Sequence, residues 1–216
     1  MKSEVRIIAF LDILGFKELI EYSERENNYT KLSNLITKST KVFSMLNAMK
    51  DFQLTQFSDS FVLSCKSLEM GDSMVFIMHL RDLIDLFLSE NILLRGGVTI
   101  GKVIHTKKIL MGPAMNRAYE LESRFANCPR VIIDRDLFDY LETCLYKYNV
   151  ENMFEVSEDD DGFYYIDYIN KSNLPTKSDI LLNKSYELLN SNIPSLMEKG
   201  TWLSEKLKKS KNSIQD

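Results

Sequence analysis

The hydrophobic pattern of the N-terminal segment changes abruptly at a single glycine. Residues 4–11 (EVRIIAFL) are apolar and rich in branched side chains over a length too short for a helix, which predicts a buried strand. After Gly15, apolar residues recur at steps of three and four, which is the spacing of one helical face. The segment is therefore expected to fold as a strand, a tight turn and a helix.

Strands and helices are expected to alternate along the rest of the chain. Helices are expected at residues 31–49, 71–89, 112–127 and 135–147, and strands at 91–104 and 131–133 and in hairpins at 52–65 and 152–169. This order predicts an α/β or α+β sandwich with one sheet. Two proline-punctuated helical stretches follow from about Asn170, and the lysine-rich segment after them is expected to fray.

Composition and charge exclude several classes of protein. Hydrophobic residues make up 44% of the 216 residues and charged residues 27%, which is typical of a folded globular protein. The net charge of −4 offers no basic face for nucleic acid, and acidic residues interrupt every apolar run that approaches the length of a membrane span. The three cysteines lack CxxC spacing, which indicates thiols in a reducing compartment, the cytoplasm.

Two carboxylates occupy positions where a metal site can form. Asp12 ends the first strand and precedes the glycine turn, so it is expected at a sheet edge beside the free N–H groups of a helix N-terminus. Asp59 is expected at the tip of the hairpin at 52–65. Each aspartate alone is better explained by a local role, as a helix cap or a turn residue. Together they form a carboxylate pair that divalent metal ions would stabilise.

A third motif combines glycines in a strand with a polar residue early in a helix. The strand at 91–104 carries the pair Gly96-Gly97, which indicates close packing or a bulge. Gly112 opens the next helix, which places Asn116 in its first turns. There the Asn116 amide is able to point into a site or to make a structural hydrogen bond, and both roles stay open.

In this order, the motifs resemble those of the class III nucleotidyl cyclases. The matching segments are FLDILGF, FSDSFVLS, RGGVTIGKV and GPAMNRAYELES, and the resemblance covers roughly residues 5–135. It implies a ferredoxin-like α+β core with one mostly antiparallel sheet, working as a head-to-tail homodimer whose active sites are shared across the interface. The change of sequence character at about Asn170 places the boundary between a catalytic domain over residues 1–170 and a C-terminal helical extension over 171–216.

The same resemblance assigns metal and phosphate contacts to individual residues. Asp12 and Asp59 would hold two Mg²⁺ or Mn²⁺ ions, with the carbonyl oxygen of Ile13 as a further ligand. The substrate would be a nucleoside triphosphate. Its β- and γ-phosphates would lie on the backbone of Ile13, Leu14, Gly15 and Phe16.

The helix that begins at Gly112 departs from the family pattern at one catalytic position. Its Asn116 would orient the ribose, but purine cyclases place an arginine four residues later, where this chain has Glu120. Arg124, one helical turn further on, is the candidate replacement for the catalytic arginine. A surface ion pair with Glu120 explains Arg124 equally well.

The base-binding positions also depart from the purine cyclases. Thr55 in the hairpin and Ile109 before the helix stand where adenylyl cyclases have Lys and Asp and guanylyl cyclases have Glu and Cys. Without these pairs a purine loses its specific partners. The pattern Asn-x-Ala-Tyr-x-Leu-Glu-Ser is similar to the pyrimidine cyclases of the Pycsar anti-phage systems, which make cyclic UMP or cyclic CMP for a separate effector. Cyclic UMP is slightly favoured here.

Other classes stay open on the sequence alone. Glu120 in place of arginine favours a cyclase-like protein that binds nucleotide without turnover. A register displaced by one residue at the base positions would weaken the argument against a purine cyclase. A palm enzyme of the polymerase or diguanylate type uses the same two-metal chemistry, but its hairpin usually carries Gly-Gly-Asp where this one carries Phe-Ser-Asp-Ser. His79 and His105 are expected to be structural or exposed.

Overall fold

The computed structural model of the chain describes residues 2–49, 51–66, 70–148, 156–169 and 174–215. Its strands are β1 (Glu4–Ile13), β2 (Gln53–Phe57), β3 (Ser60–Lys66), β4 (Leu94–His105), β5 (Leu110–Met111), β6 (Val131–Ile133), β7 (Val156–Glu158) and β8 (Tyr164–Ile166). Its helices are α1 (Phe16–Arg25), α2 (Thr30–Leu46), α3 (Met70–Ser89), α4 (Pro113–Glu120), the π-helical turn η1 (Leu121–Phe125), α5 (Arg135–Tyr148), α6 (Leu174–Leu189) and α7 (Pro194–Gln215). The expected domain boundary at residue 170 lies outside the described residues. Among the described helices, none is both long and apolar enough to cross a membrane.

The strands form one sheet that is mostly antiparallel. Within the described residues the order is β2-β3-β1-β4-β6-β8-β7, and β5 pairs with the end of β4. Only the pairing of β4 with β6 is parallel in this part of the chain. Strand β1 is central, because it pairs with β3 on one side and along its whole length with β4 on the other. The expected α+β architecture with one sheet and C-terminal helices is confirmed.

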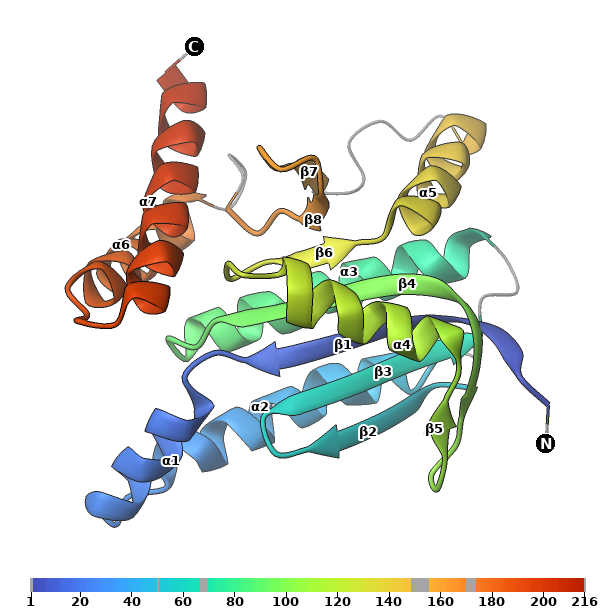
Figure 1. Cartoon of the computed structure of the whole chain (residues 1–216), viewed down its shortest axis with the longest axis horizontal. Coiled ribbons are helices and arrows are strands. Elements are labelled where there is room, and N and C mark those ends of the chain that lie inside the picture. The colour runs from blue at the N-terminus through green and yellow to red at the C-terminus, as the bar shows by residue number, and fades with distance from the viewer. Residues whose placement is uncertain (1, 50, 67–69, 149–155, 170–173, 216) are drawn as a thin grey trace.

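Helices cover both faces of this sheet. In Figure 1, α4 lies in front of the sheet, while α2 and α3 lie behind it. The side chains of β1 alternate accordingly: Ile7 and Leu11 belong to the large core that includes α2 and α3, whereas Ile8 and Phe10 pack with Ala118 of α4. A strand covered on both faces needs apolar residues at successive positions, which explains the continuous apolar run of β1.

The glycine pair of β4 allows close packing on two sides: Gly97 lets α4 and η1 lie directly on the strand, and Gly96 lies against the backbone of β1. A Cβ atom at Gly97 would lie 2.3 Å from Cβ of Leu121 and 2.6 Å from the carbonyl oxygen of Ala118. A Cβ atom at Gly96 would lie 2.4 Å from the carbonyl oxygen of Phe10 on β1. The glycine pair therefore serves close packing, one of the two roles that the sequence indicated.

Helix α7 is anchored to the turn between β7 and β8 by a buried carboxylate. Asp159 accepts hydrogen bonds from Nε1 of Trp202 at 2.7 Å and from Nζ of Lys206 at 2.6 Å. Nη1 of Arg130 lies 2.5 Å from the same carboxylate. The expectation that the lysine-rich end frays is wrong: α7 continues to Gln215. Two lysines of this segment, the buried Lys206 and the exposed Lys209, pair with the acidic turn.

Candidate functional site

Asp12 and Asp59 lie at the same end of the sheet. Asp12 is the register partner of Ser60 on β3, and the N–H group of Ile13 donates to the carbonyl oxygen of Asp59 at 2.9 Å. These bonds tie the tip of the β2–β3 hairpin to the end of β1. Burial raises the pKa of the Asp12 carboxyl; Arg95 lowers it, and the negative charge of Asp59 raises it. The structure thus brings the two carboxylates close enough to repel each other.

Arg95 joins Asp12 to a second buried acid. Its Nε donates to Oδ2 of Asp12 at 2.9 Å, and its Nη2 lies 2.8 Å from Oε1 of Glu122 as an ion pair without the alignment of a hydrogen bond. The Glu122 side chain is buried, and burial raises its pKa. Glu122 is not among the functional residues predicted from the sequence. No local signal identifies this contact, because it depends on η1 carrying Glu122 back over β4.

The two aspartates suit a site for Mg²⁺ or Mn²⁺. Mg²⁺ commonly binds one or two carboxylates and completes its shell with substrate phosphates and water. Burial is the main cause of the raised pKa of Asp12, and the charge of Asp59 adds to it, so a cation would stabilise the ionised pair. In the described part of the chain, no three His, Cys, Asp or Glu side chains are grouped as a complete metal site. Two carboxylates would leave ligand positions on such an ion for phosphate oxygens and water.

A turn suited to phosphate follows β1. Gly15 has a φ of +74°, a left-handed conformation that glycine adopts without strain, and it caps the N-terminus of α1. The first N–H groups of a helix lack partners within it and bind phosphate oxygens readily. One expected contact needs correction: the N–H group of Leu14 already donates to the carbonyl oxygen of Leu93 at 2.9 Å. Because the N–H group of Ile13 is also engaged, the amides of this turn that would remain for a phosphate are those of Gly15 and Phe16.

A cavity of about 370 Å³ adjoins this turn. Its lining includes Leu14 and Gly15 from the turn and Lys199 from α7. Lys199 is half-buried and has no ion-pair partner among the described residues; burial lowers its pKa, and so does the positive charge of Arg95. No functional residue was predicted in the C-terminal helices from the sequence. A cation in this position is suited to a phosphate group near the turn.

Asn116 and Arg124 lie on the exposed side of α4 and η1. They line an open groove of about 480 Å³, and neither of them lines the cavity beside the glycine turn. Nη1 of Arg124 donates to Oε1 of Glu120 at 3.1 Å, so Arg124 is a surface partner of Glu120 in this structure. Arg117 also pairs with Glu120, at 3.1 Å, and it binds Asp134 at 2.7 Å. Glu120 is therefore held between two arginines.

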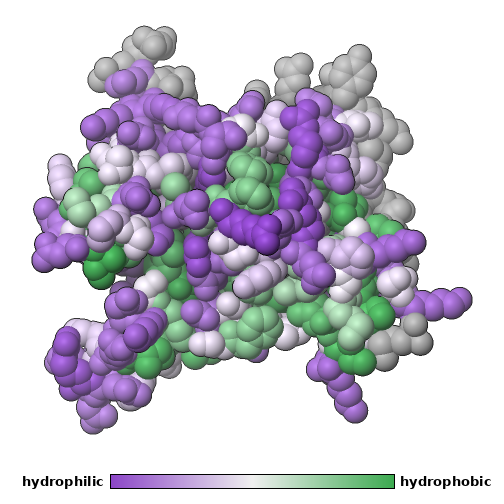
Figure 2. Space-filling model, in the orientation of Figure 1, coloured by the Kyte–Doolittle hydropathy of each residue, from purple (hydrophilic) through white to green (hydrophobic). Residues whose placement is uncertain are grey.

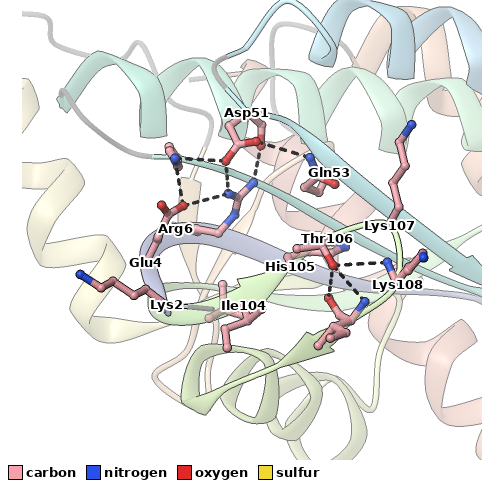
Figure 3. Close-up of a pocket in the computed structure, with 13 residues that line it drawn as sticks. Lys2, Glu4, Arg6, Asp51, Gln53, Ile104, His105, Thr106, Lys107 and Lys108 are labelled. Carbon is pink, nitrogen blue, oxygen red and sulfur yellow. Dashed lines mark hydrogen bonds and ion pairs between the residues drawn. The ribbon is translucent and has the colours of Figure 1, made fainter.

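Thr55 and Ile109 have different surroundings. Oγ1 of Thr55 lies 2.9 Å from Nε2 of His105, and Oγ of Ser64 lies 2.8 Å from Nδ1 of the same ring. Ile109 belongs to the turn between β4 and β5, where its N–H group donates to Oγ1 of Thr106 at 3.0 Å. Figure 3 shows this turn and His105 beside a cleft of about 610 Å³ near the start of β1. Ile109 lines that cleft and Thr55 does not.

The fold matches those of class III adenylyl and guanylyl cyclase domains. The adenylyl cyclase CyaB of P. aeruginosa has a TM-score of 0.57 at 15% identity, over 77% of this chain and 95% of that one. The guanylyl cyclase domain of the RhoGC fusion protein from the aquatic fungus Blastocladiella emersonii has a TM-score of 0.53 at 15% identity, over 77% and 98%. The catalytic core of a rhodopsin-guanylyl cyclase with converted specificity, in complex with ATPαS, has a TM-score of 0.51 at 14% identity, over 77% and 97%.

These likenesses establish the fold. They do not establish the function, because identities this low do not carry function from one protein to another. No protein-family model matches the chain, and no curated protein sequence matches it significantly.

Proposed function

We propose that this chain is a nucleotidyl cyclase, which converts a nucleoside triphosphate into a 3′,5′-cyclic monophosphate and pyrophosphate. The observation that carries the proposal is the pair Asp12 and Asp59 beside the left-handed turn at Gly15. Paired carboxylates suit divalent metal ions, and a helix N-terminus beside them suits phosphate. In a cyclase fold, the carboxylate pair and the helix N-terminus would serve the same reaction.

Ring closure requires an activated hydroxyl group and a neutralised triphosphate. Two Mg²⁺ or Mn²⁺ ions on Asp12, Asp59 and the Ile13 carbonyl oxygen would lower the pKa of the 3′-hydroxyl and neutralise phosphate charge. The amides of Gly15 and Phe16 would bind the β- and γ-phosphate oxygens, so that the α-phosphorus stays in line with the hydroxyl. The chain itself therefore contributes alignment and electrostatic stabilisation.

A second copy of the chain would complete each active site in a head-to-tail homodimer. Asn116 and Arg124, proposed for the ribose and the transition state, are exposed on a groove separate from the cavity at the glycine turn. Their exposure supports a role in the site of a partner. Phe57 and Tyr119 are 46% and 53% exposed and flank the ring of Phe10. Figure 2 shows apolar surface, in green, on this face below the polar surface around α4.

The substrate of the proposed reaction is UTP or CTP, with UTP favoured. Thr55 and Ile109 supply neither the Lys and Asp of adenylyl cyclases nor the Glu and Cys of guanylyl cyclases, so a purine would lack its specific partners. A pyrimidine product would act as a second messenger of the Pycsar type, made in the cytoplasm in response to phage and read by a separate effector protein.

The test is incubation of the purified protein with ATP, GTP, CTP and UTP separately, in the presence of Mn²⁺. Cyclic UMP or cyclic CMP, absent from an Asp59→Ala control, is the expected result. Cyclic AMP or cyclic GMP would keep the reaction and overturn the pyrimidine assignment. Folded dimeric protein that forms no cyclic nucleotide from any of the four would overturn the cyclase proposal.

A second candidate function is a cyclase-like protein that binds nucleotide without turnover. The observation that favours it is Glu120, which stands at the catalytic arginine position and holds both Arg117 and Arg124 in ion pairs. Tight Mn²⁺-dependent binding of a nucleotide, measured by calorimetry and unaccompanied by product, would establish this alternative.

A further inference from the structure

A single guanidinium joins a proposed metal ligand to a buried carboxylate that the proposed reaction does not use. Arg95 on β4 is the register partner of Asp12 on the neighbouring strand β1 (Figure 1), and its Nε donates to Oδ2 of Asp12 at 2.9 Å. Nη2 of the same guanidinium lies 2.8 Å from Oε1 of Glu122. The side chains of Asp12 and Glu122 are only 15% and 4% exposed, so water and salt screen these ion pairs weakly.

The fold fixes Glu122 beside Arg95. A Cβ atom at Gly97 would lie 3.3 Å from the backbone nitrogen of Glu122, so the glycine lets this part of η1 lie against β4. Oε1 of Glu122 is buried and accepts no hydrogen bond among the described residues. Its ion pair with Arg95 is what compensates the buried charge, and a buried charge without a partner is costly. Glu122 therefore depends on Arg95 for its charge.

The charges of the two aspartates act on Glu122 as well. Burial is the main cause that raises the pKa of Glu122; Arg95 lowers it, and the negative charges of Asp12 and Asp59 raise it further. Three acids therefore lie close enough to interact, and Arg95 binds two of them. A change at Arg95 or Glu122 would reach the proposed metal ligands.

Arg95 and a metal ion would compete for the Asp12 carboxylate. A guanidinium on a carboxylate oxygen offsets part of its negative charge, and it also repels a second cation nearby. An arginine that pairs with one carboxylate alone frequently makes two parallel bonds to it. Here Nη2 of Arg95 is engaged by Glu122, and the hydrogen bond to Asp12 runs through Nε. Glu122 thereby weakens the hold of Arg95 on Asp12.

We propose that Arg95 and Glu122 are positioning residues that set the metal affinity of Asp12. Arg95 competes with the ion for this carboxylate, and Glu122 limits the competition by drawing Arg95 toward itself. The pair thus offsets the charge of Asp12 in the metal-free protein without closing the site to a metal ion. The inference rests on the proposed function, and specifically on Asp12 as a metal ligand.

The test measures the Kd for Mn²⁺ alone, without nucleotide, from the paramagnetic resonance signal of the free ion. We expect Arg95→Met to bind Mn²⁺ about tenfold more tightly than the wild type, and Glu122→Gln about tenfold more weakly. A merely structural role of Arg95 predicts the opposite sign, because a loosened Asp12 would be a poorer ligand. Equal or weaker binding by folded Arg95→Met protein would overturn the inference.

The double variant Arg95→Met/Glu122→Gln shows whether Glu122 acts through Arg95. It replaces a buried ion pair by neutral side chains of similar size, a change that proteins often tolerate. Its Kd for Mn²⁺ should lie within about twofold of that of Arg95→Met. A full tenfold loss from Glu122→Gln in the Arg95→Met background would mean that Glu122 acts by its own charge, which contradicts its positioning role.

Two further variants separate the possible failures. Lys199→Met removes a cation whose charge also lowers the pKa of Asp12 but which does not hydrogen-bond to it, so it should tighten Mn²⁺ binding less than Arg95→Met does. Equal tightening by both would show that contact with Asp12 is irrelevant. Asp12→Asn should abolish Mn²⁺ binding. If the wild type and Asp12→Asn bind Mn²⁺ alike, the proposed metal site falls together with the inference, whereas loss in Asp12→Asn with no change in Arg95→Met overturns the inference alone.

Discussion

At the scale of single residues, the charge of Asp12 has opposite consequences for stability and for metal binding. Burial raises the pKa of this carboxyl, which means that its ionised form is disfavoured in the folded protein. Stability is therefore lost as the pH rises from the unfolded pKa through the folded one. We predict that metal-free Asp12→Asn unfolds at a higher temperature than the wild type at pH 7, and at a similar temperature at pH 3.

Bound metal should reverse this order of unfolding temperatures between the wild type and Asp12→Asn. At a Mn²⁺ concentration of about 100 times its Kd, a site on the folded protein stabilises it by about 2.7 kcal/mol. Thermal unfolding should show this gain for the wild type and for Asp82→Asn, which alters an exposed carboxylate of α3, but not for Asp12→Asn. An equal Mn²⁺ effect on all three proteins would mean that Asp12 is not a ligand.

Arg124 and Arg117 both pair with Glu120, but Arg117 also binds the largely buried carboxylate of Asp134. The Arg124 side chain is 72% exposed, so its removal should leave stability within about 1 kcal/mol of the wild type. If Arg124 serves the transition state of a partner site, Arg124→Ala should lower kcat about 100-fold with little change in KM. Arg117→Ala is the matched variant: it leaves the largely buried Asp134 without its cation and should lower the unfolding temperature. Wild-type kcat in Arg124→Ala would exclude the catalytic role.

At the scale of elements, the acidic turn between β7 and β8 holds α7 in place. Burial opposes the charge of Asp159, but hydrogen bonds from Lys206 and Trp202 hold its pKa at about 2. A lowered pKa stabilises the fold above the unfolded pKa, near 4, and the gain is lost as the pH falls through about 2. We predict that Asp159→Asn destabilises the protein by several kcal/mol at pH 7, because two cations lose their buried carboxylate.

Asp160→Asn provides the control for this prediction. Asp160 is the next residue, is largely exposed and pairs with the exposed Lys209, so its substitution should change stability by about 1 kcal/mol or less. Chemical denaturation at pH values between 5 and 2 should show the deficit of Asp159→Asn shrinking toward the acid end. A deficit that stays constant with pH would contradict the ionic anchor.

Local signals predicted most of the elements, and long-range contacts explain what they missed. The hairpin with Asp59 at its tip and the helix that follows Gly15 are visible in turn residues and hydrophobic spacing. The fraying of α7 was predicted wrongly because the partner of Lys206 is Asp159, which lies 47 positions away in the sequence. No spacing rule connects such residues before the fold is known.

In the candidate site, too, some features follow from local sequence signals and others depend on long-range contacts. Asp12 and Asp59 each follow a local signal, and the sheet register brings them together. Arg95 reaches Glu122 only because β4 and η1 lie against each other, and Lys199 arrives on a helix outside the segment that resembles the cyclases. The bond between Thr55 and His105 joins strands whose pairing order sequence periodicity does not reveal.

At the scale of the whole molecule, the residues proposed for catalysis lie on two different surfaces. The residues proposed for metal and phosphate lie near the end of β1, while Asn116 and Arg124 line the groove along α4. Under the proposed function, a single copy would offer each nucleotide only part of the groups that the reaction requires. Two copies related by a two-fold axis would supply both halves twice, and the apolar surface at Phe57 and Tyr119 lies on the face that would be covered.

This arrangement predicts complementation between inactive variants. Asp59→Ala removes a proposed metal ligand and Asn116→Ala a proposed ribose contact, so each homodimer should be inactive. In a mixed dimer, both defects fall in one site and the other site is intact. Equal mixing of the two variants, with exchange of subunits, should therefore recover about a quarter of wild-type activity, because about half of the dimers are mixed and each has one working site. Cyclic nucleotide formation by the mixture measures this directly. A mixture as inactive as its components, in protein shown to exchange subunits, would place all catalytic groups of a site within one chain.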